Sequence, residues 1–338
     1  MTAPHLQVIA PGGASNVWAM TDIDPEEAGL GVARPPARPP GPVPAGFVPA
    51  EGAEVLLPPR WTDSQLTTGA GPGGGLLPDP LGPPPRTKSA AWRWILYALI
   101  GFLVGQVVGA VFGIVAGDIA GKNAAQMKAI TAASVPPEWY VLSTLSGLWV
   151  GFFGAPWLAS RRQGTRSFVA DLGLRFRWVD LWGIGIGVAA QIVIALLYAP
   201  FRHHIHNFDA PSQKLTGGAH GAGFLVVALA TVILAPFMEE LFFRGLLFKA
   251  LTRLFTPNRP GTTRARGVAV VVAVVVDGLL FGLAHGEWLQ LAGLALFGAV
   301  LAAISYRTGR LGMNMVSHAS FNLVAVLAIL SQRGGVIH

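Results

Sequence analysis

Residues 221–255 read GAGFLVVALATVILAPFMEELFFRGLLFKALTRLF. About 20 mostly apolar residues cross a bilayer as a helix, and this run is both longer than that and largely apolar. Its middle nevertheless carries Pro236, Glu239, Glu240 and Arg244. The run therefore predicts either one kinked membrane helix or two shorter ones, with ionisable groups inside the apolar layer.

Six further apolar runs flank this one. All seven lie near residues 92–116, 139–160, 180–199, 221–255, 267–285, 288–305 and 312–331. Only 12% of the 338 residues are charged, whereas about 25% are charged in ordinary soluble domains. We predict an all-α fold, a polytopic transmembrane helical bundle of seven or eight spans at 92–331.

Residues 1–88 have a different composition. Eighteen of the 26 prolines lie in residues 1–90, and glycines cluster near residue 73. Such a segment buries too little apolar surface to fold, so we predict a disordered tail, which acts as a solvated tether or binds a polyproline-binding partner. Because no basic region followed by an apolar run opens the chain, the first span is expected to direct membrane insertion and the tail to be retained.

The net charge of +7 arises outside the tail, which holds five basic and eight acidic residues. The basic residues flank the predicted spans at Arg86, Lys88, Arg93, Arg161, Arg162, Arg166, Arg175, Arg177, Arg253, Arg259, Arg264, Arg266, Arg307 and Arg310. The positive-inside rule then predicts a multi-pass protein of the cell membrane with a cytoplasmic tail and membrane lipids as partners. No nucleic-acid partner is predicted, because no groove-reading element accompanies the charge. The absence of cysteine excludes disulfides, thiolate metal sites and cysteine nucleophiles.

Ionisable side chains inside spans cost roughly 2.5–3.5 kcal/mol each on insertion, so each one is a functional candidate. In this chain they are Glu239, Glu240 and Arg244 in the fourth run, Asp277 and His285 in the fifth, and His318, with Asn322, in the last. Few others lie inside the predicted spans. The three regions that carry them are the candidate site.

Helix geometry separates the two adjacent glutamates. Glu240 and Arg244 stand at i and i+4 on one helix face, where pairing lowers the cost of burying both charges. Glu239 is rotated about 100° away and is free for general base work. The alternative is that all three residues form one ion-pair knot that holds helices together.

The histidines complete the pattern. His318 and Asn322 are again at i and i+4 and project from the last helix together, either toward a substrate or as a polar clamp between helices. Glu239, His285 and His318 suit either a base-activated water or a divalent metal such as zinc. Neither a His-Glu-x-x-His run nor a Gly-x-Ser-x-Gly elbow is present. We interpret Asp277 as supporting or structural, and His203, His204 and His206 as a loop cluster able to bind a metal adventitiously.

The motifs Glu239-Glu240-x-x-x-Arg244, Phe281-x-x-x-His285 and His318-x-x-x-Asn322 resemble, in this order, those of the CAAX-protease and bacteriocin-processing family, CPBP or Abi. The resemblance spans roughly residues 165–331 and implies a helical bundle that hydrolyses peptide bonds in or near the membrane. It implies that Glu239 activates a water with His285, and that His318 and Asn322 stabilise the oxyanion. Glu240 and Arg244 would support the motif helix.

Members of this family have been described both as metalloproteases and as glutamate-dependent enzymes, and the sequence leaves metal dependence open. Peptides or membrane proteins are the expected substrates, with prenylated CAAX ends as one candidate. The alternative hypothesis is a non-catalytic membrane scaffold or bacteriocin self-immunity protein, and a third is a transporter with a buried ion site.

Overall fold

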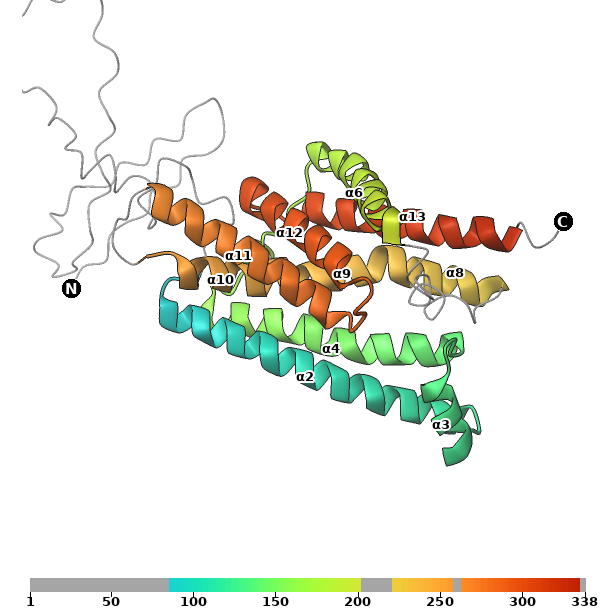
Figure 1. Ribbon diagram of the computed structural model, residues 1–338. Coiled ribbons are helices and arrows are strands. Elements are labelled where there is room, and N and C mark those ends of the chain that lie inside the picture. The colour runs from blue at the N-terminus through green and yellow to red at the C-terminus, as the bar shows by residue number, and fades with distance from the viewer. Residues whose placement is uncertain (1–84, 202–220, 258–262, 335–338) are drawn as a thin grey trace, which may run out of the picture. The chain divides into compact units, whose positions relative to one another are not determined.

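The computed structural model describes residues 85–201, 221–257 and 263–334, and in these residues every regular element is a helix (Figure 1). The predicted all-α fold is thereby confirmed. The predicted tail lies outside the described residues except for its last four positions. The cluster of His203, His204 and His206 also lies outside them.

The elements follow one another with short connections. The α-helices are α2 (Lys88–Ile119), α3 (Ala124–Ala132), α4 (Glu138–Gln163), α5 (Phe168–Leu172), α6 (Gly183–Tyr198), α8 (Gly221–Leu229), α9 (Ala235–Glu240), α10 (Lys249–Phe255), α11 (Thr263–Ala284), α12 (Leu291–Thr308) and α13 (Gly312–Gly334). Two 3₁₀ turns are η1 (Trp178–Trp182) and η2 (Ala199–Phe201), and two π-helical segments are η3 (Ala230–Leu234) and η4 (Leu241–Phe248).

Within the described residues, seven helical runs are long and apolar enough to cross a membrane. They are Lys88–Ile119, Glu138–Gln163, Trp178–Phe201, Gly221–Phe255, Thr263–Ala284, Leu291–Thr308 and Gly312–Ser331. The fourth is a single run from α8 to α10, so seven spans rather than eight are found. His285 was expected inside the fifth span, but α11 ends at Ala284 and His285 begins the following turn.

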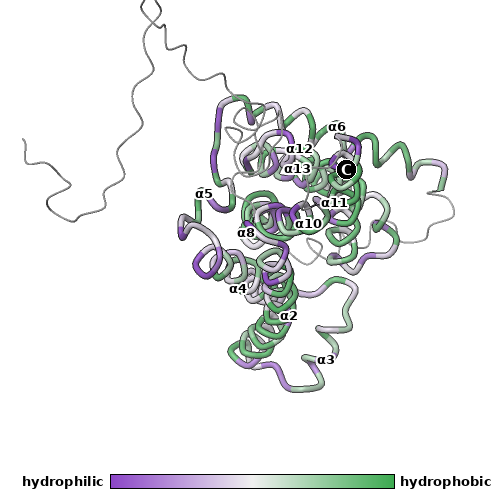
Figure 2. Tube along the Cα trace, turned by 90° about the vertical axis from the view of Figure 1, so that its left-hand side faces the viewer, coloured by the Kyte–Doolittle hydropathy of each residue, from purple (hydrophilic) through white to green (hydrophobic). Residues whose placement is uncertain are grey.

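The helices carry their apolar side chains on the outside of the bundle, and their traces are largely hydrophobic in Figure 2. Val107, Leu196 and Val271 are all more than half exposed. No span buries more than 33% of its most apolar window inside the protein. Apolar surface on this scale requires a lipid environment rather than water, so the chain is a multi-pass membrane protein.

Glycines allow α2 and α4 to pack closely. The buried glycines of α2 recur at every fourth position, namely 101, 105, 109, 113 and 117. A Cβ on Gly147 of α4 would lie 2.5 Å from the Cα of Gly109, and one on Gly109 would lie 2.7 Å from the carbonyl oxygen of Thr144. Small residues that let backbones approach in this way are a main source of helix association in lipid.

We expect Gly147→Val to destabilise the bundle by about 1–3 kcal/mol, because its side chain would meet backbone that cannot move aside. Gly154→Val is the matched control, since nothing lies within 4 Å of a Cβ at Gly154 on the same helix. Thermal unfolding of the two variants in detergent measures the difference. Equal unfolding temperatures would contradict close packing of α2 on α4.

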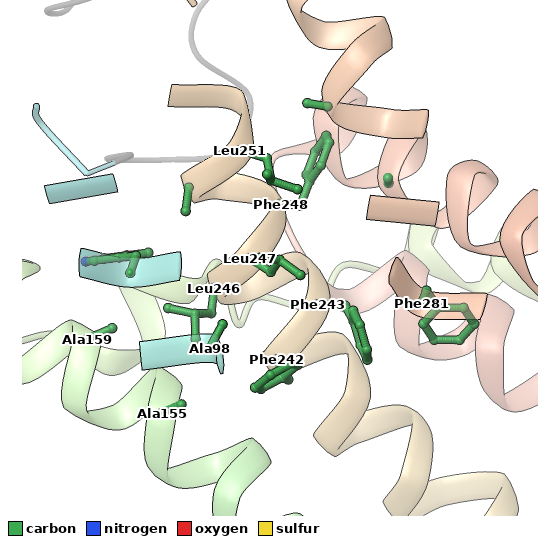
Figure 3. Close-up of a cluster of buried hydrophobic side chains, with 14 of the residues drawn as sticks. Ala98, Ala155, Ala159, Phe242, Phe243, Leu246, Leu247, Phe248, Leu251 and Phe281 are labelled. Atoms are coloured by element: carbon green, nitrogen blue, oxygen red, sulfur yellow. The ribbon is translucent and has the colours of Figure 1, made fainter. Parts of the chain in front are cut away.

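The fourth span packs against three others. Figure 3 shows side chains of η4 and α10 pointing to both sides: Phe242 and Leu246 toward Ala98 of α2, and Phe243 toward Phe281 of α11. The rings of Phe243 and Phe281 meet edge to face with centroids 5.2 Å apart. Large side chains from one helix thus fill the space left by alanines and anchor the span that carries the glutamates.

Segments rich in basic residues meet at one end of the bundle. Arg253 Nη2 donates a hydrogen bond to the carbonyl oxygen of Arg86 at 3.1 Å, and Lys249 Nζ donates to that of Asp171 at 2.5 Å. Arg310 pairs with a buried carboxylate of η1, with Nη2 2.7 Å from Oδ1. These contacts join the start of span one, the end of span four and the loops after spans two and six, which the positive-inside rule places on one side.

Candidate active site

A buried ion-pair cluster fixes the middle of the fourth span. Arg244 Nη1 lies 3.0 Å from Glu240 Oε1, and Arg244 Nε lies 3.3 Å from Asp277 Oδ2, with all three side chains fully buried. Arg244 Nη2 also donates to the carbonyl oxygen of Gly298 at 2.9 Å. The expected pair of Glu240 and Arg244 is therefore present. Asp277 belongs with it as the second carboxylate facing the guanidinium, which compensates for the burial of the charge.

Two side chains of α13 extend this cluster. His318 Nδ1 lies 2.9 Å from Glu240 Oε1, and Asn314 Nδ2 donates to Glu240 Oε2 at 3.1 Å. Asn314 Nδ2 also donates to the carbonyl oxygen of Leu301 at 2.7 Å. The sequence analysis did not identify Asn314. Its signal was the spacing, since Asn314, His318 and Asn322 lie at i, i+4 and i+8 and form one polar stripe on a helix.

Glu239 takes no part in the Arg244 cluster. Its Oε2 lies 3.7 Å from His318 Nε2 and 3.9 Å from His285 Nε2, and it accepts no hydrogen bond from any described residue. The Glu239 side chain is 18% exposed and that of His285 is 31% exposed, whereas that of His318 is 4% exposed. Three spans thus bring these side chains to one partly accessible point.

The other ring nitrogens define how the histidines face Glu239. His285 Nδ1 lies 2.8 Å from the carbonyl oxygen of Phe281, which only accepts, so Nδ1 donates the hydrogen. His318 Nδ1 likewise donates to the Glu240 carboxylate, because Glu240 is paired with Arg244. In the neutral histidines both Nε2 atoms then carry a lone pair directed at Glu239. Three acceptors around one point call for a hydrogen-bond donor such as water between them.

Aromatic rings enclose the histidines. Phe281 lies 4.7 Å from the His285 ring and 5.6 Å from the His318 ring, and Phe297 lies 5.5 Å from the His318 ring, all between centroids. The face of Phe281 also lies 4.4 Å from the Arg244 guanidinium carbon. These contacts fix the imidazole orientations and limit the access of bulk water.

Asn322 makes a different contact from the one that an oxyanion donor would show in the resting state. Its Nδ2 donates to the carbonyl oxygen of Thr231, in η3, at 2.8 Å. At least one of its two N–H groups is therefore engaged by the fourth span. The predicted role of Asn322 as an oxyanion donor stays a prediction.

A metal ion fits the donor types better than their arrangement. A carboxylate and two imidazoles are ligands that zinc accepts, with bonds of about 2.0–2.2 Å. Within the described ranges, however, no three histidine, aspartate or glutamate side chains form a group that could hold a metal ion. The geometry thus favours water as the species held between Glu239, His285 and His318.

Comparison with family models finds one match, over residues 221–324, to the type II CAAX prenyl endopeptidases described as Rce1-like. The matched segment contains all the site residues named above except those of the flanking packing helices. Comparisons with curated proteins and with solved structures found no match. The resemblance inferred from the three motifs is confirmed, and the region from α8 to α13 belongs to the Rce1-like family of CAAX proteases.

Proposed function

We propose that the chain is an intramembrane endopeptidase that uses Glu239 as the general base for a water molecule. The observation that carries the proposal is the convergence of Glu239 Oε2 with the Nε2 atoms of His285 and His318. These atoms come from three different spans and lie beside a buried ion-pair cluster that does not use Glu239. Membership of the CAAX protease family supports peptide-bond hydrolysis as the reaction.

The residues divide the chemistry as follows. Glu239 takes a proton from the water as its oxygen attacks the peptide carbonyl, and it then delivers that proton to the departing amine. His285 accepts a hydrogen bond from the water and orients it. His318, held by Glu240, faces the same point and, when protonated at Nε2, donates to the oxyanion of the tetrahedral intermediate.

The proposed substrate is a peptide that reaches the site from the membrane. The family description names prenylated CAAX ends, in which a lipid-modified cysteine lies close to the carboxyl terminus. A lipid anchor would hold such a peptide at the bilayer, where the spans that carry Glu239 and His318 lie. We further propose that the amino-terminal tail is cytoplasmic, on the side where the basic segments meet.

Purified protein in lipid vesicles tests this proposal with two peptides that share a CAAX end and differ only in prenylation. We expect cleavage of the prenylated peptide, and a fall of about 10²-fold or more in kcat for His285→Gln, because general acid–base groups contribute that much. We also expect cleavage to persist after treatment with a zinc chelator and desalting.

Three outcomes separate the parts of this proposal. Cleavage that is lost on chelation and restored by zinc would overturn the role of Glu239 as base for a free water. Equal cleavage of both peptides would overturn prenyl recognition and keep the peptidase. Full activity in His285→Gln would contradict its part in the site.

A further inference from the structure

The fourth span changes its hydrogen-bond register just before the glutamates. The N–H of Ala235 donates to the carbonyl oxygen of Ala230, a bond between residues five apart, as in a π-helix. The next bond in this register would join the N–H of residue 236 to the carbonyl oxygen of Thr231. Residue 236 is proline, which has no N–H, so this bond cannot form.

The carbonyl of Thr231 is therefore left without its helical donor inside a membrane span. A backbone carbonyl in hydrocarbon costs several kcal/mol when it has no partner. Asn322 Nδ2 supplies the partner, at 2.8 Å from the Thr231 oxygen. The side chain of one span thus replaces the backbone donor that the proline removed from another.

This contact is one of two that join α13 to the fourth span. His318, one helical turn before Asn322, donates to Glu240 at 2.9 Å. The two contacts hold the span at residues 231 and 240, and Glu239 lies between them in the sequence. Two fixed points prevent the helix from rotating about its axis, and such rotation would turn Glu239 away from the histidines.

We propose that Asn322 is a positioning residue that replaces the backbone donor missing at Pro236 and thereby holds Glu239 in register with His285 and His318. The inference rests on the proposed peptidase function for its catalytic consequence. It assigns Asn322 a task in the resting protein, which differs from donation to an oxyanion during the reaction.

A cycle of two substitutions tests this inference in the full-length protein. Asn322→Ala is expected to lower kcat by about 10²-fold, the effect of a misplacement near 1 Å, and to lower the unfolding temperature. Pro236→Ala restores an N–H at residue 236 that can donate to the Thr231 carbonyl. The double variant Pro236→Ala/Asn322→Ala is therefore expected to recover at least tenfold in kcat over Asn322→Ala and to regain unfolding temperature.

The matched control is Pro156→Ala/Asn322→Ala, because Pro156 also lies inside a membrane helix but far along the chain from the Thr231 carbonyl. It should show no recovery. A double variant at Pro236 that unfolds like wild type yet stays as slow as Asn322→Ala would overturn the inference and make Asn322 a catalytic donor.

Failure of the proposed function is visible separately, as a wild-type protein that cleaves neither peptide. In that case the unfolding temperatures still decide the contact. Recovery at Pro236 but not at Pro156 supports the exchange of donors at Thr231, and strictly additive losses overturn it.

Discussion

Glu239→Gln is expected to lower peptide cleavage by about 10²–10⁴-fold while the protein remains folded in the membrane. Glutamine keeps the shape of the side chain and removes only its capacity to take a proton. The structural cost should be small, because Glu239 lies outside the ion-pair cluster of Arg244 and its Oε2 accepts no hydrogen bond from a described residue. Cleavage of the prenylated peptide in vesicles measures the activity, and thermal unfolding measures the fold.

The control for this substitution is Glu138→Gln, which neutralises a carboxylate at the start of α4 and leaves the site untouched. We expect it to cleave as wild type does. A Glu239→Gln protein that keeps the activity or cellular phenotype of wild type would favour the scaffold hypothesis, in which the polar cluster serves folding alone.

Arg244→Met is expected to cause the largest loss of stability, about 3–5 kcal/mol, because it leaves two buried carboxylates without their counter-charge. Glu240 and Asp277 both face this guanidinium, and all three side chains are fully buried. Methionine has a similar length and apolar character, so the loss reports the charge more than the packing. The free energy of unfolding in mixed detergent measures it.

Arg307→Met serves as the control, since Arg307 is an exposed residue at the end of α12. It should change the free energy of unfolding by less than about 1 kcal/mol. If the two variants unfold alike, the buried cluster does not hold the fourth span in place. A second test is Asp277→Asn, which should recover part of the stability lost in Arg244→Met because it removes one of the unpaired charges.

Much of the fold follows from hydropathy. The seven apolar runs match the seven helical spans because a bilayer admits only structures whose backbone bonds are satisfied within the segment. Boundaries were less well predicted, and His285 lies just past the helix that was expected to contain it. The short helix α3 was not predicted, although Asn123 and Gln126 form a capping box that marks its start.

Prediction of the site succeeded where the spacing within one helix is decisive. Glu240 and Arg244 are neighbours because i and i+4 always are, and Glu239 is left out of their pair for the same reason. The partners on other helices could not be derived in this way. Asp277 facing Arg244 and Asn314 facing Glu240 depend on how spans four, five and seven pack, which a single sequence does not specify.

Asn322 illustrates this limit most clearly. Its spacing from His318 shows only that the two project together from one helix. The carbonyl it contacts depends on the π-helical register of η3 and on the proline that follows. Register changes of this kind arise from tertiary packing and have no reliable sequence pattern, although Pro236 marks where to look.

Mapping of newly formed protein amino termini in membranes tests the peptidase proposal most directly, because it requires no prior choice of substrate. Wild type and Glu239→Gln would be expressed at equal levels in cells that lack the native protein. We predict termini that appear with wild type and are absent with Glu239→Gln, several of them on membrane-anchored proteins. Identical sets of termini in the two strains would contradict the assignment of Glu239 as the catalytic base.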